Sequence, residues 1–154
     1  MRFLLFDRIT TVEPGRRLEA VKHVSISDGA LADHYPLRAV LPPTLAVEAM
    51  AQLGGMLHVL SNDFTVEVLL VLVDRVSLAR PVLHGETLTI EATSERSHPY
   101  GATMRARALV GDEVVAAAER IAYAHGEIDD PKRIDSARAR FAYQSGVPLP
   151  AATA

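Results

Sequence analysis

A histidine and a carboxylate in one short stretch of the chain could work together as base and acid. His34 lies in a proline-rich segment, and Glu48 follows fourteen positions later inside an apolar run. An imidazole has a near-neutral pKa and could remove a proton next to a carbonyl group. A carboxyl group that stays neutral could help to expel a hydroxyl as water. These residue types therefore suit the elimination of water, provided that the two side chains meet in space.

The sequence predicts that Glu48 lies on a helix running from Pro43 to about Leu60. Proline suits the first helical position, because its missing N–H costs the helix nothing there. The following side chains are apolar in nearly every direction around the axis, which is typical of a buried helix. Thr44, Glu48 and Gln52 interrupt this pattern at intervals of four and form one narrow polar stripe. Gln52 is therefore the simplest hydrogen-bond partner for Glu48.

Each of the two candidate residues also has a purely structural interpretation. Burying a carboxylate is costly, so Glu48 needs either a polar partner, such as an arginine or a dimer seam, or a chemical use. His34 taken alone is most simply an ordinary loop histidine. The N-terminus of the helix could stabilise a developing negative oxygen close to both residues. Gly54 and Gly55 lower the helix propensity and predict the close approach of another backbone.

Strands are predicted around this helix. Alternation over residues 18–27 places Leu18, Ala20, Val24 and Ile26 on one buried face. Residues 28–43 predict a loop. Residues 3–9 open the chain with apolar side chains, and further strand-like segments occupy residues 66–82 (as two strands hinged near Asp74), 86–96, 103–110 and 113–124. A single long helix with a run of antiparallel strands predicts an α+β fold, in which the sheet wraps the helix.

The 154 residues predict one domain over residues 1–125, followed by a C-terminal extension over residues 126–154. In the extension, Asp130 followed by a proline predicts the start of a short, basic, peripheral helix at 129–144. The Pro- and Ala-rich end, residues 145–154, predicts disorder.

The composition narrows the functional classes. A net charge of −3 gives no basic surface for nucleic acid, and the absence of cysteine excludes thiolate chemistry and fits a reducing cytoplasm. The six histidines show no metal-ligand spacing, so neither a metal nor another cofactor is expected. The chain has no apolar run of roughly 18 residues and its start lacks a secretory signal, so we expect no membrane span.

Three stretches carry a resemblance to a known family over about residues 3 to 124. They are "FLLFDRITTVEPGRRLEAVKHVSI", "HYPLRAVLPPTLAVEAMAQLGGML" and "RVSLARPVLHGETLTIEA". In this order they resemble the β-hydroxyacyl-acyl-carrier-protein dehydratases of bacterial fatty-acid synthesis, which have the hot-dog fold. The interval between His34 and Glu48 is the one in the family signature.

The resemblance implies a fold, a reaction and partners. It implies a long central helix wrapped by a curved antiparallel sheet, and a homodimer that can assemble into a hexamer. It implies that His34 is the base and that Glu48, from the other subunit, is the acid or orients water. The implied substrate is a β-hydroxyacyl thioester on the phosphopantetheine of an acyl-carrier protein, and the product is the trans-enoyl thioester. Arg138 and Arg140 of the extension could dock that acidic carrier, although a solvated helix is the simpler interpretation.

The chain departs from the family signature near the helix start. Leu37 and Ala39 replace a glycine and a proline, and Pro43 stands where the family has a glycine whose N–H bonds the thioester oxygen. Proline has no N–H, and losing such a donor typically costs about two to three orders of magnitude in rate. Thr44 could supply the donor instead, so the oxyanion and substrate-binding candidates are Pro43, Thr44 and Gln52. The departures suggest a divergent member, serving a specialised acyl or polyketide pathway.

Two other functions fit the same features. Hot-dog thioesterases use a carboxylate to activate water at the same carbonyl. A non-catalytic subunit that binds acyl chains or pairs with an active partner would explain Pro43.

Overall fold

The computed structural model describes residues 4–32, 35 and 38–146. The predictions that concern His34, Leu37 and residues 147–154 therefore lie outside the described residues.

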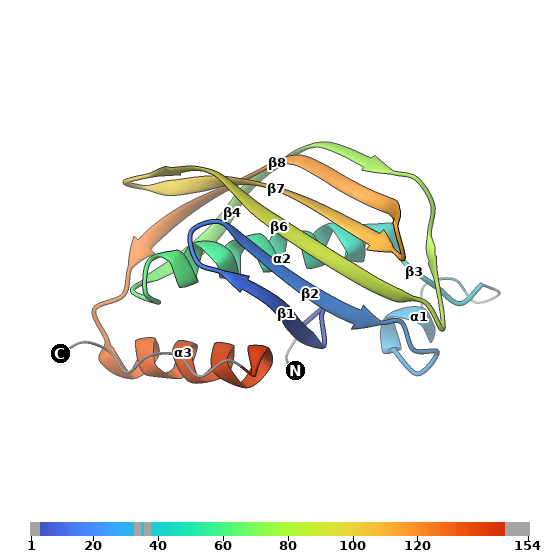
Figure 1. Ribbon diagram of the computed structural model, residues 1–154, viewed down its shortest axis with the longest axis horizontal. Coiled ribbons are helices and arrows are strands. Elements are labelled where there is room, and N and C mark those ends of the chain that lie inside the picture. The colour runs from blue at the N-terminus through green and yellow to red at the C-terminus, as the bar shows by residue number, and fades with distance from the viewer. Residues whose placement is uncertain (1–3, 33–34, 36–37, 147–154) are drawn as a thin grey trace.

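One antiparallel sheet of six strands curves around α2 (Pro43–Ser61), as Figure 1 shows. The strands lie in the order β1-β2-β6-β7-β8-β4, so β1 and β4 form the two edges. Their bounds are β1 Arg8–Glu13, β2 Arg17–His23, β4 Val66–Leu78, β6 Thr87–His98, β7 Gly101–Val110 and β8 Glu113–Glu127. This arrangement is the predicted α+β hot-dog fold, with a sheet that wraps one central helix.

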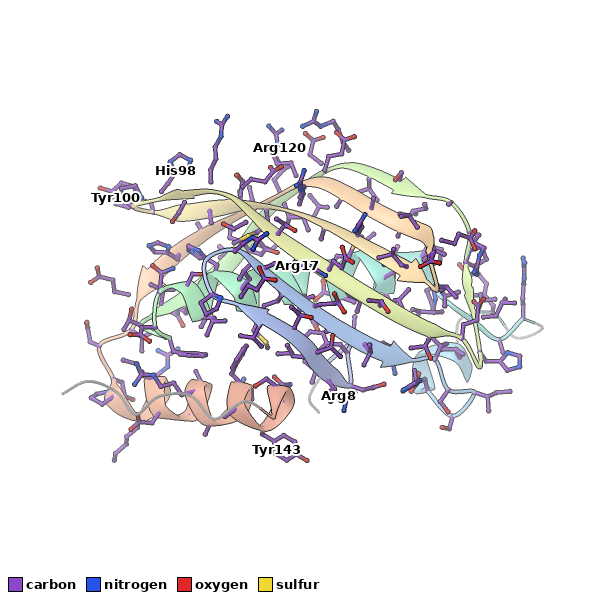
Figure 2. All side chains as sticks on the ribbon, in the orientation of Figure 1. Arg8, Arg17, His98, Tyr100, Arg120 and Tyr143 are labelled. Carbon is purple, nitrogen blue, oxygen red and sulfur yellow. The ribbon has the colours of Figure 1, made fainter. Side chains whose placement is uncertain are left out.

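The core lies between α2 and the concave face of the sheet. Met50, Leu53 and Leu57 are fully buried on the helix, and Ile90 and Ile121 meet them from the strands. Burying a side chain of this size contributes about 1.5–3 kcal/mol, so this layer fixes the position of α2. The outer face of the sheet is polar, with Arg17 and Arg120 among the side chains that Figure 2 labels.

The prediction that α2 is buried on all sides is only partly right. Ten of its residues are buried, but Thr44 is exposed and Glu48 and Gln52 are half-buried. The predicted polar stripe therefore marks the side of the helix that the sheet does not cover.

Three predictions about the strands and the loop were wrong in detail. Residues 66–78 form the single strand β4 in place of two, because the pairing with β8 continues on both sides of Arg75, although Arg75 takes a left-handed φ of 53°. Ile26 follows the end of β2 and is 66% exposed, whereas the other three side chains of its predicted face are buried. The loop at 28–43 contains a short helix and a strand paired with a further one: α1 Gly29–Ala32, β3 Val40–Leu41 and β5 Val82–Leu83.

The C-terminal helix α3 (Pro131–Ser145) begins as the sequence predicts. The Asp130 side chain accepts a hydrogen bond from the Lys132 N–H at 3.0 Å, and Gly146 ends the helix with a left-handed φ of 64°. Most of α3 is exposed at the periphery of the fold, but it is attached to the core. It packs next to β1, and Phe141, which is 1% exposed, meets the ring of Phe64 edge-on at 5.6 Å. α3 is therefore anchored to the same core as the sheet.

Candidate active site

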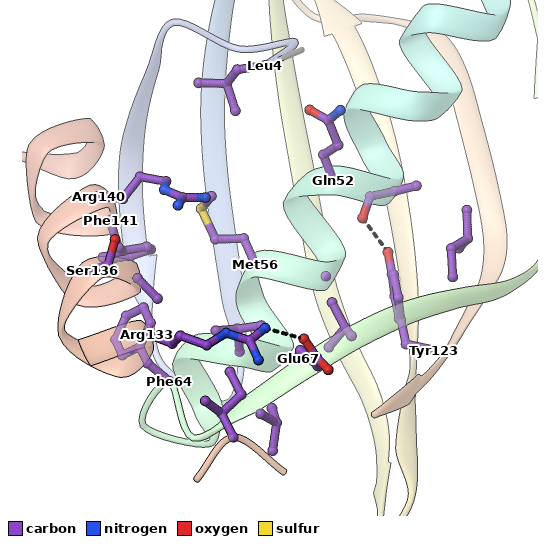
Figure 3. Close-up of a pocket in the computed structure, with 18 of the residues that line it drawn as sticks. Leu4, Gln52, Met56, Phe64, Glu67, Tyr123, Arg133, Ser136, Arg140 and Phe141 are labelled. Carbon is purple, nitrogen blue, oxygen red and sulfur yellow. Dashed lines mark hydrogen bonds and ion pairs between the residues drawn. The ribbon is translucent and has the colours of Figure 1, made fainter. Parts of the chain in front are cut away.

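A cavity of about 650 Å³ follows the uncovered side of α2. Its walls come from α2, from β4, from Tyr123 on β8 and from α3, and Figure 3 shows this arrangement. Most lining side chains are apolar. Two of the residues singled out from the sequence, Glu48 and Gln52, line it.

Gln52 holds the Glu48 carboxylate from one turn further along α2. The Gln52 side-chain amide donates to Glu48 Oε1 at 3.0 Å, which confirms the predicted hydrogen bond. The Gln52 carbonyl oxygen accepts from the Leu5 N–H at 3.2 Å, so the amide is fixed from both ends. This arrangement restricts the rotamer of Glu48 and leaves its second oxygen available to a ligand in the cavity.

The other two candidates lie at the start of α2 and are not among the cavity-lining residues. Pro42 caps the helix without a side-chain hydrogen bond, and Pro43 occupies the first turn. Thr44 is exposed and lies about 6 Å from Glu48 along the helix axis. Its N–H is one of the first-turn groups that have no intrahelical carbonyl to bond. The structure thus joins Glu48 and Gln52 in one site and leaves Thr44 at the helix end beside it.

Tyr123 is a cavity residue that the sequence analysis missed. Its hydroxyl donates to the Ala51 carbonyl of α2 at 2.6 Å. Burial raises the pKa of Tyr123 above its ordinary value, and the negative charge of Glu48 raises it further. The hydroxyl therefore stays protonated and keeps donating to α2.

The glycine pair in α2 was the signal that could have pointed to Tyr123. We expected a neighbouring backbone at Gly54 and Gly55, but the group that approaches them is the Tyr123 side chain. A Cβ on Gly54 would lie 2.6 Å from the Tyr123 hydroxyl oxygen, and one on Gly55 would lie 3.4 Å from the ring. Gly54 therefore leaves the space that the Tyr123 hydroxyl occupies, and at Gly55 a Cβ would be only tightly accommodated.

Among the described residues, no group of three or more His, Asp or Glu side chains is placed to hold a metal ion. None of the helices described is both long and apolar enough to span a bilayer.

Comparison with known proteins connects this site to a family. The FabA-like domain matches residues 1–119. The chain is 38% identical over 117 residues to 3-hydroxyacyl-(acyl-carrier-protein) dehydratase FabZ of Symbiobacterium thermophilum, covering 75% of this chain and 82% of the relative. It is 36% identical over 121 residues to the protein of the same name in Variovorax paradoxus, covering 75% and 80%.

Solved structures agree on the fold. The dehydratase heterocomplex ApeI:P of Xenorhabdus doucetiae superposes with a TM-score of 0.66 at 17% identity, covering 86% of this chain and 88% of the other. The family match includes α2 with Glu48 and ends within β8, before Tyr123, whereas α3 lies beyond it. By family match and by sequence identity, this chain belongs to the FabA-like family.

Proposed function

We propose that this protein removes water from a β-hydroxyacyl thioester and releases the trans-enoyl thioester, in fatty-acid or polyketide-type synthesis. The observation that carries the proposal is the Glu48 carboxylate, held by Gln52 at a largely apolar cavity in a chain of the FabA-like family. The named relatives are dehydratases, which supports the same reaction class.

The reaction needs two proton movements, and two residues are assigned to them. His34 takes the proton from the carbon next to the thioester carbonyl. The electron pair of that C–H bond forms the C=C bond as the C–O bond at the β-carbon breaks. In its carboxylic acid form, Glu48 gives a proton to the leaving hydroxyl, so that water departs. As a carboxylate it would only orient the hydroxyl, and the proton taken up by His34 would then go to the leaving oxygen. The Thr44 N–H at the positive end of α2 stabilises the negative carbonyl oxygen in place of Pro43.

A second copy of the chain would complete the site. β4 is an edge strand, and it exposes a run of apolar side chains: Leu69, Leu70, Val71 and Leu72. An exposed apolar edge is a ready surface for pairing with another strand. We propose that β4 pairs with its counterpart in a homodimer, which brings His34 of one subunit to Glu48 of the other. Such dimers could associate further into a hexamer.

We further propose that the substrate arrives on the phosphopantetheine arm of an acyl-carrier protein in the cytoplasm. The carrier protein in the relatives' names supports this partner, and the lack of cysteine fits a reducing compartment.

The test follows formation of the enoyl product from a β-hydroxyacyl thioester by the purified protein. We expect His34→Ala and Glu48→Gln each to lower kcat by about a hundredfold or more. Glu91→Gln is the control, because Glu91 is a carboxylate of β6 that pairs with Arg107 and does not line the cavity. Its kcat should stay within a few-fold of the wild type. Wild-type turnover no faster than that of the His34→Ala/Glu48→Ala double variant would refute the proposal.

The two alternative functions give different results in the same assay. A thioesterase releases free thiol, which a thiol reagent detects, and forms no enoyl product. A non-catalytic subunit gives neither product until it is mixed with an active partner. Neither alternative is favoured by the named relatives.

A further inference from the structure

We propose that α3, a helix beyond the family match, forms the wall that limits the length of the acyl chain in the cavity. The family match ends at residue 119, and α3 begins at Pro131. This inference rests on the proposed function, because it concerns the acyl chain of the same substrate. It assigns the choice of substrate to a segment that the matched family domain does not include.

The cavity is long enough to make chain length a meaningful property. It begins at Glu48 and follows one face of α2 through Gln52, Met56 and Val59. Eleven residues of helix separate its two ends, which corresponds to about 16 Å along the axis. This length accommodates an extended alkyl chain on the order of a dozen carbons beyond the reacting group.

α3 forms one side of the distal half of this cavity. The residues of α3 that line it form adjacent pairs that recur every four positions, so one face of the helix is turned inward: Lys132, Arg133, Ser136, Ala137, Arg140 and Phe141. Figure 3 shows Arg140 reaching from α3 towards Met56 of α2. The acyl chain would therefore pass between α2 and α3 once it extends beyond Gln52.

Two contacts hold α3 in this position. Phe141 packs against Phe64 at the end of the cavity. Arg133 forms an ion pair with Glu67 of β4 at 2.6 Å, and Figure 3 shows this bond joining α3 to β4 beside the cavity. The buried Phe141–Phe64 contact is the main anchor of the wall, because the Arg133–Glu67 pair is exposed on both sides and contributes little.

Most of the lining surface is apolar and favours an alkyl chain. Its apolar side chains include Met56, Val59 and Val68, whereas the charged ones on the α3 side, Lys132, Arg133 and Arg140, are exposed to solvent. The polar groups beside α2 are already paired, the Tyr123 hydroxyl with Ala51 and the Gln52 amide with Glu48 and Leu5. An alkyl chain gains about fourfold in affinity for each methylene that it buries.

The experiment compares one substitution at two positions of α3. Ala137→Leu places a larger side chain in the cavity wall, whereas Ala139→Leu places it on an exposed position that does not line the cavity. Alanine and leucine are both strong helix formers, so neither change should disturb α3 itself. The kcat/KM is measured for β-hydroxyacyl thioesters from four to sixteen carbons. A fluorescent fatty acid displaced by saturated fatty acids of the same lengths gives a binding series that needs no turnover.

We expect Ala137→Leu to leave the shortest substrates within about twofold of the wild type and to lower kcat/KM for the longest by at least tenfold. Fatty-acid binding should shift to shorter chains in parallel, and Ala139→Leu should match the wild type in both series. Equal effects of Ala137→Leu at all lengths would overturn the inference. A change in the oligomeric state of the Ala137→Leu variant, measured by size-exclusion chromatography, would also overturn the inference, because the partner subunit would then fill the space.

The two proposals fail in distinguishable ways. If no substrate is dehydrated, the proposed reaction fails, and the binding series still decides whether α3 limits chain length. If short and long substrates are dehydrated alike by Ala137→Leu and the wild type, the reaction stands and the role of α3 falls.

Discussion

The hydroxyl oxygen of Tyr123 lies 2.6 Å from the place where a Cβ on Gly54 would be. The same hydroxyl donates to the Ala51 carbonyl, so one tyrosine of β8 meets α2 at two neighbouring positions. Because Glu48 and Gln52 lie on the preceding turns of that helix, this contact also fixes their position along the cavity. Gly54 is therefore needed for the packing that supports the site.

Gly54→Ala should destabilise the fold although alanine is the better helix former. The gain in helix propensity is about 1 kcal/mol, but a contact of 2.6 Å forces either the tyrosine or the helix to move. We expect a net loss of about 1–3 kcal/mol in the free energy of unfolding, measured by urea denaturation. Gly55→Ala is the control, since its nearest neighbour would be at 3.3 Å, and its loss should be smaller.

The Tyr123→Phe background should reverse the effect of Gly54→Ala. Removing the hydroxyl leaves 3.4 Å between the new Cβ and the ring carbon Cζ, which is an ordinary contact. Tyr123→Phe itself should cost about 1 kcal/mol for the lost hydrogen bond to Ala51. In that background, Gly54→Ala should be neutral or stabilising by denaturation. An unchanged penalty would mean that the hydroxyl is not the cause.

The sequence predicted the elements that follow from periodicity and helix caps. The strip of polar side chains at intervals of four placed Glu48 and Gln52 on one face of α2, and the structure confirms their hydrogen bond. The helix cap at Asp130 involves neighbouring residues only, so it could also be predicted from the sequence. Period-two alternation gave most of the strands, but not the end of β2 before Ile26, where the alternation continues into a loop.

Contacts between distant segments could not be predicted in this way. The pairing of Tyr123 with Gly54 joins residues far apart in sequence, and only the fold brings them together. The same holds for Phe141, which charge and composition placed on a solvated helix but which the core buries. A single apolar residue every few positions does not reveal which surface it will cover.

Gln52→Ala should lower kcat more than it raises KM. The amide donates to Glu48 and accepts from Leu5, so its loss frees the carboxylate to take several rotamers. Losing a group that acts by orienting another should lower kcat about tenfold and leave KM within a few-fold of the wild type. Gln52→Glu is the companion variant, because a second carboxylate beside Glu48 should shift the pH–rate profile. If Glu48→Gln and the double variant Glu48→Gln/Gln52→Ala lose the same amount of kcat, Gln52 acts through Glu48. Losses in kcat that multiply in the double variant would contradict this.

Pro43→Gly should raise the rate of dehydration. The substitution supplies an N–H at the first turn of α2, next to Thr44, where a carbonyl oxygen would become negative. We expect a rise in kcat of about tenfold or more, with a loss of stability of about 1 kcal/mol from the added backbone freedom. Pro43→Ala also restores an N–H with less freedom, and it should reproduce the gain. No gain in either variant would show that the Thr44 N–H already serves the oxyanion.

Val71→Lys should convert the proposed homodimer into monomers. Val71 is 63% exposed in the middle of the edge strand β4, and in the proposed dimer a lysine there would be buried against the second copy. Light scattering after size-exclusion chromatography should show half the mass, and dehydration should fall with it because the proposed site needs both subunits. Ile26→Lys is the control at a similar exposure, 66%, on a loop away from β4. A dimer that survives Val71→Lys would place the interface elsewhere.

The His58–His125 pair should make the fold sensitive to mild acid. His58 Nε2 and His125 Nδ1 lie 2.7 Å apart, their rings stack at 5.0 Å, and His58 is buried at the end of α2. Burial lowers the pKa of His58 below 6.5, and the charge of His125 lowers it further. The unfolded chain therefore binds a proton at a pH where the folded chain does not. Stability is complete above about pH 6.5 and is lost as the pH falls below it.

His58→Gln should flatten this pH dependence. The variant removes the titrating group, so its unfolding temperature should fall less between pH 7.5 and pH 5.5 than that of the wild type, whatever its value at pH 7.5. His98→Gln serves as the control, because His98 is exposed at the end of β6 and should leave the slope unchanged. If His58→Gln and the wild type lose stability in parallel on acidification, the acid sensitivity does not come from His58. The pair would then serve only to close α2 against β8.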